Sequence, residues 1–188
     1  MRKIIVTEFL TLDGVMEDPG GGDESEYGGW SAQFWSKEAE EFKHDELFAS
    51  DALLLGRVTY QGFAAAWPAM TDDTGFAERM NNVPKYVVST TLEEVEWNNS
   101  RLIKGNLAEE ISKLKQEPGQ DITVHGSGQL VNSLMQYDLI DEYRLMIHPV
   151  VVGGGKRLFK ENSHAKNLSL VETHTFKSGI VVLIYKSV

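Results

Sequence analysis

Apolar residues recur along this chain in two patterns that alternate with each other. Short runs rich in Ile, Val and Leu predict strands over residues 3–9, 52–55, 85–89, 121–124 and 141–149. Between them, apolar residues at helical spacing predict helices over 30–49, 57–65, 76–81, 107–116 and 127–137. Two closing runs, 168–176 and 180–185, predict an antiparallel hairpin. The alternation predicts an α/β fold with a mixed, mostly parallel central sheet.

The first predicted helix and the loop before it carry most of the local detail. Helical spacing over 30–49 gives five candidate inner positions: Phe34, Ala39, Phe42, Leu47 and Phe48. The preceding loop, 10–29, is long, and a loop of that length in a compact domain is more often functional than idle. No repeat, linker or low-complexity stretch divides the chain, so we expect one domain over residues 1–188.

Composition and charge narrow the class of partner. The formal net charge of -10 argues against nucleic acid and against a membrane surface, because their phosphates repel an acidic protein. An anionic ligand then needs Arg, Lys or helix N-termini that reverse the local field. The absence of cysteine excludes disulfides and thiol catalysis. The N-terminal apolar run is too short for a signal peptide and is interrupted by Glu8, so we expect a cytoplasmic protein without membrane segments.

A first candidate site lies in Leu53 to Phe63, which reads LLLGRVTYQGF. A buried strand ends at Gly56 and a helix begins there, and ligands of open α/β sheets collect at such strand ends. Arg57 suits bidentate pairing with a phosphate, and Thr59 adds a hydroxyl group. The alternative is that Gly56 is only a tight turn and Arg57 forms a surface salt bridge.

A second candidate site lies in Val124 to Leu130, which reads VHGSGQL. Gly126 and Gly128 permit close approach of a ligand to the backbone, and Ser127 can cap the helix. The segment fails the GxGxxG dinucleotide pattern because Val131 replaces the third glycine, and VGGGKR at 152–157 fails the P-loop pattern. Two strand–glycine–helix turns nevertheless suggest a bound dinucleotide rather than a lone anion.

The remaining chemistry-bearing residues give weaker signals. None of the five histidines has the spacing of metal ligands, so no metal site is expected. No GxSxG nucleophile turn is present, since Ser127 sits in HGSGQ. Asp13 and Gly14 follow the first strand and either form an ordinary turn or belong to a loop that closes over a flat ring. One of the crowded acids at 38–46 can turn inward to orient a heterocycle, but spacing does not say which.

These segments, in this order, resemble the dihydrofolate reductase fold and, more narrowly, the family built around the C-terminal reductase domain of riboflavin-biosynthesis proteins. The matching pieces are LDG at 12–14, LLLGRVTY at 53–60, VVST at 87–90, HGSGQLVNSLM at 125–135 and LIDEYRLMIHPVVVGGGKRLF at 139–159. The resemblance implies a three-layer sandwich, NADPH as hydride donor and a pteridine- or dihydrofolate-like substrate, or one like 5-amino-6-(5-phosphoribosylamino)uracil. It also implies that related domains often pair, so we expect a homodimer, with the apolar strand 143–152 as its candidate surface.

The resemblance also assigns roles to residues by position. Gly56, Arg57 and Thr59 would take cofactor phosphates, and Ser89 and Thr90 would lie near the adenosine ribose and its 2′-phosphate. Asp13 and Gly14 would close over the nicotinamide. The residues that would wrap the pyrophosphate are Gly126, Ser127, Gly128, Gln129 and Leu130.

Departures from the family pattern concern the acid–base residues. His125 stands where riboflavin-pathway members carry an acid, and Ser127 replaces the second of their paired glycines. The acid that meets the substrate in dihydrofolate reductases would be Glu38 or Glu40. We expect an NADPH-dependent reductase in which Asp13, Glu38 or His125 assists proton transfer. The alternative is a nucleotide- or drug-binding module on the same fold that does not turn over.

Overall fold

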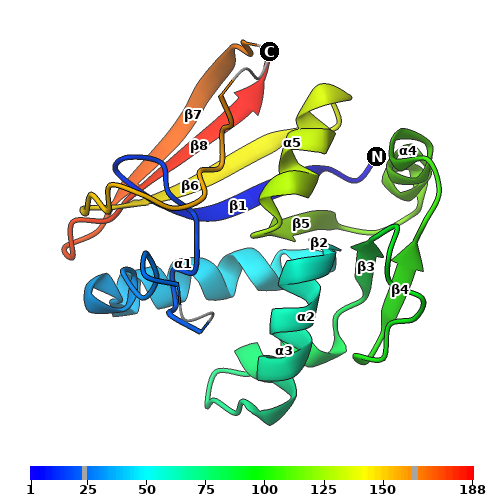
Figure 1. Cartoon of the computed structure of the whole chain (residues 1–188), viewed down its shortest axis with the longest axis horizontal. Helices are drawn as coiled ribbons and strands as arrows, with labels where there is room; N and C mark the ends of the chain where they lie inside the picture. The colour runs from blue at the N-terminus through cyan, green and yellow to red at the C-terminus, as the bar shows by residue number, and fades with distance from the viewer. Residues whose placement is uncertain (23–24, 162–164) are drawn as a thin grey trace.

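The computed structural model describes residues 1–22, 25–161 and 165–188. One eight-stranded sheet crosses it in the order β4-β3-β2-β5-β1-β6-β8-β7 (Figure 1). Its strands are β1 (Ile4–Thr11), β2 (Ser50–Gly56), β3 (Lys85–Val88), β4 (Ser100–Ile103), β5 (Asp121–His125), β6 (Glu142–His148), β7 (Leu168–Thr175) and β8 (Val181–Ser187). Neighbouring strands are parallel from β4 to β6, whereas β8 is antiparallel to both β6 and β7. This arrangement confirms the predicted mixed sheet and its C-terminal hairpin.

Helices cover both faces of the sheet and make three layers (Figure 1). They are α1 (Lys37–Phe48), α2 (Arg57–Ala66), α3 (Phe76–Asn82), α4 (Leu107–Gln116) and α5 (Gly128–Gln136), with short 3-10 turns η1 (Ala32–Phe34) and η2 (Trp67–Ala69). Strand β2 shows how the layers form, because alternate side chains leave a strand on opposite faces. Leu53 and Leu55 pack with α1, α2 and α3, whereas Leu54 packs with α4 and α5.

The predicted helix over 30–49 is wrong at its N-terminal end. The chain forms η1 first, and α1 begins only at Lys37, where the Ser36 side chain accepts a hydrogen bond from the Ala39 N–H at 3.3 Å. This N-cap ends the preceding extended segment, so Phe34 lies outside α1. Phe48, an expected inner position, is 43% exposed instead, and it stacks on the imidazole ring of His44. Ala39 and Leu47 are buried as expected.

The sheet topology adds a strand that the sequence pattern does not predict and bears on the candidate dimer surface. Strand β4 was not predicted, because it is a four-residue edge strand with the exposed Arg101 in it and so has no clear apolar pattern. The apolar segment 143–152 was the candidate dimer surface, but its strand β6 pairs with β1 on one side and β8 on the other. Burial inside the sheet explains the apolar residues of this segment up to His148, whereas Val151, beyond the strand, is 66% exposed. The homodimer therefore gains no support from this strand and stays a prediction.

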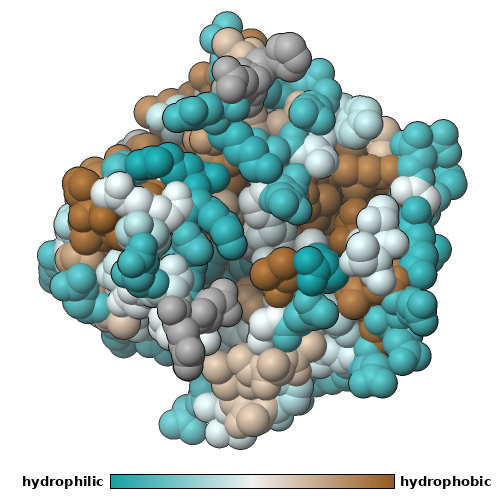
Figure 2. All heavy atoms as spheres, in the orientation of Figure 1, coloured by the Kyte–Doolittle hydropathy of each residue, from teal (hydrophilic) through white to brown (hydrophobic). Residues whose placement is uncertain are grey.

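The surface of the molecule is mixed in character. Hydrophilic residues dominate the rim of the face seen in Figure 2, and hydrophobic residues form patches between them. Within the described ranges, no helix is long and apolar enough to cross a membrane.

Because β2 packs against helices on both faces of the sheet, shortening one of its buried side chains should strongly lower the free energy of unfolding. Leu54 is fully buried, and Leu54→Ala is expected to lower the free energy of unfolding by about 2–5 kcal/mol, because the cavity left behind cannot close completely. Val58→Ala, at a position 62% exposed, should change it by less than about 0.5 kcal/mol. Chemical denaturation of both variants makes the comparison. Equal effects would show that β2 is not part of the core.

Candidate functional site

The two glycine turns identified in the sequence lie side by side. Strands β2 and β5 are parallel neighbours, with Leu54 opposite Val124, so their C-terminal ends meet at one edge of the sheet. The Gly56 N–H donates to Ser127 Oγ at 2.9 Å, and the Ser127 N–H donates to Thr59 Oγ1 at 2.9 Å. Ser127 Oγ also donates to the His125 carbonyl at 3.0 Å. Segments about 70 residues apart are thus fixed to each other by reciprocal hydrogen bonds.

The second turn requires an unusual backbone. Gly126 and Ser127 both have positive φ, +54° and +61°. A Cβ atom on Gly126 would lie 2.9 Å from Thr59 Oγ1, too close for an ordinary contact. Glycine at this position therefore allows the β5–α5 turn to pack directly against the first turn of α2.

Helices α2 and α5 both begin at the paired turns, and their N-termini lack the side-chain caps that the other helices have. Ser36 caps α1, Asn106 caps α4, and Asp72 accepts hydrogen bonds from the first N–H groups of α3. Within the described residues, no side chain accepts a hydrogen bond from the first-turn N–H groups of α2 or α5. Free N–H groups and the positive ends of two helices make a suitable place for an anionic ligand.

Other residues predicted to bind cofactor surround the two turns. Arg57 is exposed in the first turn of α2, where its guanidinium donates to Gln61 Oε1 at 3.0 Å. Strand β3 pairs with β2 through Val88 opposite Gly56, which brings Ser89 and Thr90 to the same edge of the sheet. The Ser89 hydroxyl accepts the N–H groups of residues 91 and 92, whereas Thr90 is exposed. In the first turn of α5, Gln129 is exposed and Leu130 is buried.

The loop after β1, which holds Asp13 and Gly14, reaches the same region. The Asp13 carboxylate accepts a hydrogen bond from the Thr11 hydroxyl at 2.6 Å and others from the N–H groups of Val152 and Gly153. These donors lower the pKa of Asp13 to about 2, so it is ionised near neutral pH. Farther along the loop, Met16 lies over the start of α5, because a Cβ atom on Gly128 would be 2.7 Å from its sulfur. Asp13 thus holds this loop against the segment after β6.

The other two predicted acid–base residues lie in different places. His125 ends β5 beside the paired turns, and its buried Nε2 has no partner among the described residues. Burial and the nearby Lys43 lower the pKa of His125 to about 3, so its ring is neutral near pH 7. Glu38 instead lies in the first turn of α1 and accepts the Lys177 N–H of the β7–β8 turn at 2.9 Å. The structure therefore brings His125 to the turns but engages Glu38 with the hairpin.

The acid of α1 that turns inward is Glu46, which spacing alone did not select. Its carboxylate is buried and forms an ion pair with Lys43, accepts the Thr7 hydroxyl at 2.8 Å, and lies 3.4 Å from Arg144. Burial alone would raise the pKa of Glu46, but Lys43 and other nearby groups outweigh it and lower the pKa. Thr7 is opposite His125 in the β1–β5 pair, so this network borders the paired turns. The charged groups of this network pair with one another, so the network forms a fixed polar surface beside the paired turns.

A second buried acid, Glu8, interrupts the first apolar run of the sequence. It lies on β1 with 4% of its surface exposed, and its Oε1 atom has no hydrogen-bond partner in the part of the chain described. Burial raises the pKa of Glu8 well above its usual value, and the attraction of Lys43 does not compensate.

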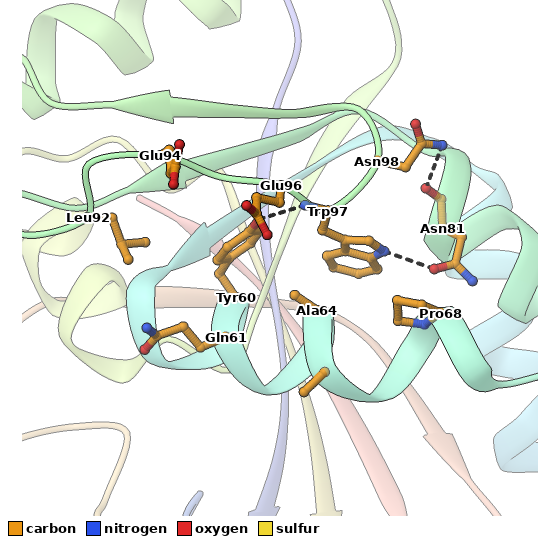
Figure 3. A pocket seen from close by; sticks show the side chains of 11 residues that line it. Tyr60, Gln61, Ala64, Pro68, Asn81, Leu92, Glu94, Glu96, Trp97 and Asn98 are labelled. Carbon is orange, nitrogen blue, oxygen red and sulfur yellow. Dashed lines mark hydrogen bonds between the residues drawn. The ribbon is translucent and has the colours of Figure 1, made fainter.

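A separate hollow of about 930 Å³ lies on the other flank of α2 (Figure 3). Tyr60, Gln61 and Ala64 of α2 line one side, and the segment between β3 and β4 lines the other with Trp97. The two charged residues that line it are Glu94 and Glu96, which would repel phosphates. The hollow is thus a poorer place for an anionic ligand than the paired turns.

A metal ion has no evident place in this arrangement. Across residues 1–22, 25–161 and 165–188, no group of three or more His, Cys, Asp or Glu side chains is placed to hold one. The polar groups at the strand ends are backbone amides, hydroxyl groups and buried side chains that include Glu8, Glu46 and His125.

Comparison with known proteins supports the resemblance seen in the sequence. The chain is 34% identical over 187 residues to the uncharacterized protein YyaP of Bacillus subtilis (strain 168), covering 98% of this chain and 94% of YyaP. A crystal structure from Shewanella sp. PV-4, named for riboflavin biosynthesis, superposes with a TM-score of 0.77 at 21% identity over 99% of both chains. Dihydrofolate reductase from Enterococcus faecalis, solved with NADP(H), superposes with a TM-score of 0.61 at 12% identity, covering 98% of this chain and 96% of that one.

The sequence model of one family spans nearly the whole chain. The RibD C-terminal domain matches residues 2–182. Together with the dihydrofolate reductase-like architecture of the sheet and its hairpin, this match shows that the chain belongs to the RibD C-terminal domain family.

Proposed function

We infer that this protein is an NADPH-dependent reductase of a small nitrogen heterocycle. The substrate class we propose is a pteridine of the dihydrofolate type or a pyrimidine like 5-amino-6-(5-phosphoribosylamino)uracil. The observation that carries the proposal is the meeting of two helix N-termini without side-chain caps at the ends of β2 and β5. Two adjacent anion sites suit a ligand that carries several linked phosphates.

The residues at the strand ends fit such a cofactor. Gly126 leaves its backbone accessible, whereas any side chain at this position would overlap Thr59. Helices α2 and α5 both direct positive partial charge to this edge of the sheet, in a protein whose net charge is -10. Arg57 is exposed in the first turn of α2 and can pair with a 2′-phosphate, with Ser89 and Thr90 directly after the neighbouring strand β3. NADPH would supply the hydride, and the protein's part is to hold the donor ring against the substrate.

Family membership agrees with this proposal. The solved dihydrofolate reductase with NADP(H) shares the fold, and the chain belongs to a family whose model carries the RibD C-terminal name. Hydride transfer needs donor and acceptor carbons about 3–3.5 Å apart in a site without free water. A buried polar wall at Glu46 and a fixed loop at Asp13 are features that can hold such a geometry.

Proton delivery is best assigned to water rather than to the three candidate side chains. Asp13 is a carboxylate held by backbone N–H groups, and His125 is neutral with its pKa far below 7. Glu38 is engaged with the β7–β8 turn. We therefore propose that Asp13 and His125 position the loop and the β5 end, and that the proton reaches the substrate from solvent.

Thermal unfolding with and without NADPH tests the binding part of the proposal. A ligand that binds only the folded state stabilises it, by about 2.7 kcal/mol at 100 times its dissociation constant. We expect millimolar NADPH to raise the Tm, and oxidation of NADPH to follow when a dihydropterin or an aminouracil is added. No change of Tm would remove the proposal. A rise of Tm without turnover on either substrate class would favour the non-catalytic binding module.

Arg57→Ala tests which end of the cofactor lies at α2. Because only NADPH carries the 2′-phosphate, we expect its affinity to fall about 10-fold and that of NADH about twofold or less. Arg101→Ala, at another exposed arginine, on β4, serves as the matched control and should alter neither affinity. Calorimetric titration gives both affinities. Equal losses for NADPH and NADH would show that Arg57 does not contact the 2′-phosphate.

The low pKa of His125 predicts part of the acid sensitivity of the fold. Its pKa falls from 6.5 to about 3 on folding, so between these values the unfolded state binds more protons. His125 should therefore reduce stability as the pH falls through this window, by at most ~1.4 kcal/mol per pH unit. His125→Asn should make the free energy of unfolding depend less steeply on pH, as measured by chemical denaturation from pH 6.5 to 4. An unchanged slope would contradict the assignment.

A further inference from the structure

The hollow between α2 and the segment that joins β3 to β4, residues 89–99, has no part in the proposed reaction (Figure 3). Its volume of about 930 Å³ is in the range of sites that hold small organic molecules, roughly 300–1,000 Å³. Tyr60 and Ala64 line it from α2. Leu92 and Trp97 line it from the segment opposite, so both sides offer apolar surface to a ligand.

Trp97 is a wall of this hollow that is fixed by three contacts. Its backbone N–H donates to the Tyr60 hydroxyl at 3.0 Å, and its indole Nε1–H donates to Asn81 Oδ1 at 2.9 Å. The Lys85 ammonium group lies 4.1 Å from the centroid of the indole ring and donates to three backbone carbonyls. A wall that is already fixed loses little conformational freedom when a ligand binds, which favours affinity.

Tyr60 adds a hydrogen-bond donor to the hollow. This residue is 5% exposed, and its hydroxyl oxygen accepts the Trp97 N–H. A hydroxyl group also carries one proton to donate, and no described residue accepts it. Because buried polar groups almost always find partners, the free O–H points to an acceptor on a ligand.

Two carboxylates give the hollow its charge. Glu94 and Glu96 line it, and neither forms an ion pair with another described residue. Their neighbour Glu93 is exposed but is not one of the lining residues. Two unpaired negative charges, in a protein of net charge -10, create a local potential that attracts cations.

We propose that this hollow is a second binding site, which takes a small organic cation made of a flat ring, an oxygen acceptor and an ammonium group. The ring packs against Trp97, the oxygen accepts from the Tyr60 hydroxyl, and the ammonium group lies near Glu94 and Glu96. The site does not depend on the proposed function, because the hollow lies on the other flank of α2 from the paired turns.

The test uses three compounds that share a 4-hydroxyphenyl ring and differ in the charge of the side chain. Tyramine ends in an ammonium group, 2-(4-hydroxyphenyl)ethanol in a neutral hydroxyl group and 3-(4-hydroxyphenyl)propionate in a carboxylate. The double variant Glu94→Gln, Glu96→Gln removes both charges and keeps the side-chain size, and Glu93→Gln is the matched control. Amide chemical shifts of residues 92–98 give each dissociation constant, and thermal unfolding checks that each variant folds.

The unchanged protein and Glu93→Gln should bind tyramine about fivefold tighter than the neutral alcohol, the effect expected of two exposed ion pairs. The propionate should bind more weakly than the alcohol, because the carboxylates repel it. In the double variant, tyramine and the alcohol should differ by less than about twofold. The affinity of the alcohol itself should stay within about twofold of that of the unchanged protein.

A further variant, Ala64→Leu, tests whether the compounds lie in the hollow. A larger side chain on this wall of α2 should weaken tyramine and the alcohol alike, by about 10-fold, because it fills space that the ring would occupy. Unchanged binding to Ala64→Leu would place the compounds elsewhere and overturn the proposal.

Three other results would also overturn it. They are equal affinities of the unchanged protein for tyramine and the alcohol, a loss of the preference in Glu93→Gln as large as in the double variant, and an absence of tyramine binding. If a tetralysine peptide shifts the same amide signals while tyramine does not, the face suits a basic partner chain instead of a small cation. None of these results bears on NADPH binding at the paired turns.

Discussion

The hydrogen bonds of Ser127 are the constraint on which the candidate site depends. Its Oγ atom accepts the Gly56 N–H, and its own N–H donates to Thr59 Oγ1, so each turn supplies the other with a partner. This exchange satisfies groups inside the turns and leaves the first N–H groups of α2 and α5 without side-chain acceptors in the described chain. The parallel pairing of β2 and β5 brings the positive ends of the two helices to one edge of the sheet, and these bonds fix the two turns to each other.

Local charge, rather than total charge, decides what this acidic protein can bind. A net charge of -10 repels anions at a distance, but the partial charges of helix termini act within the first turn of a helix. The buried charges nearby are arranged so that they do not disturb this field. Lys43 and Arg144 pair with the Glu46 carboxylate, and burial raises the pKa of Glu8. A buried polar atom without a partner costs about 1–3 kcal/mol, and two such atoms, Glu8 Oε1 and His125 Nε2, lie beside the turns among the described residues.

The sequence predicts the positions of the turns but not the side chains that line the space between them. Gly56 and Gly126 follow apolar runs directly, and parallel strands carry their ends to one edge, so local pattern and topology suffice there. Glu46 is one of several acids on α1, and only the packing of that helix on Thr7 and Arg144 selects it. Glu8 breaks an apolar strand pattern, and the pattern does not show that its side chain is buried. The helix over 30–49 is interrupted at Ser36, whose cap competes successfully with apolar spacing.

Backbone amide chemical shifts during a titration with NADPH test the central claim most directly. The account predicts that the amide signals of residues 56–59 and 126–130 shift together and saturate at one ligand concentration, because both turns contact one molecule. Signals at the hollow lined by Tyr60 and Trp97 should change less. Shifts confined to that hollow, or to one turn without the other, would contradict the account.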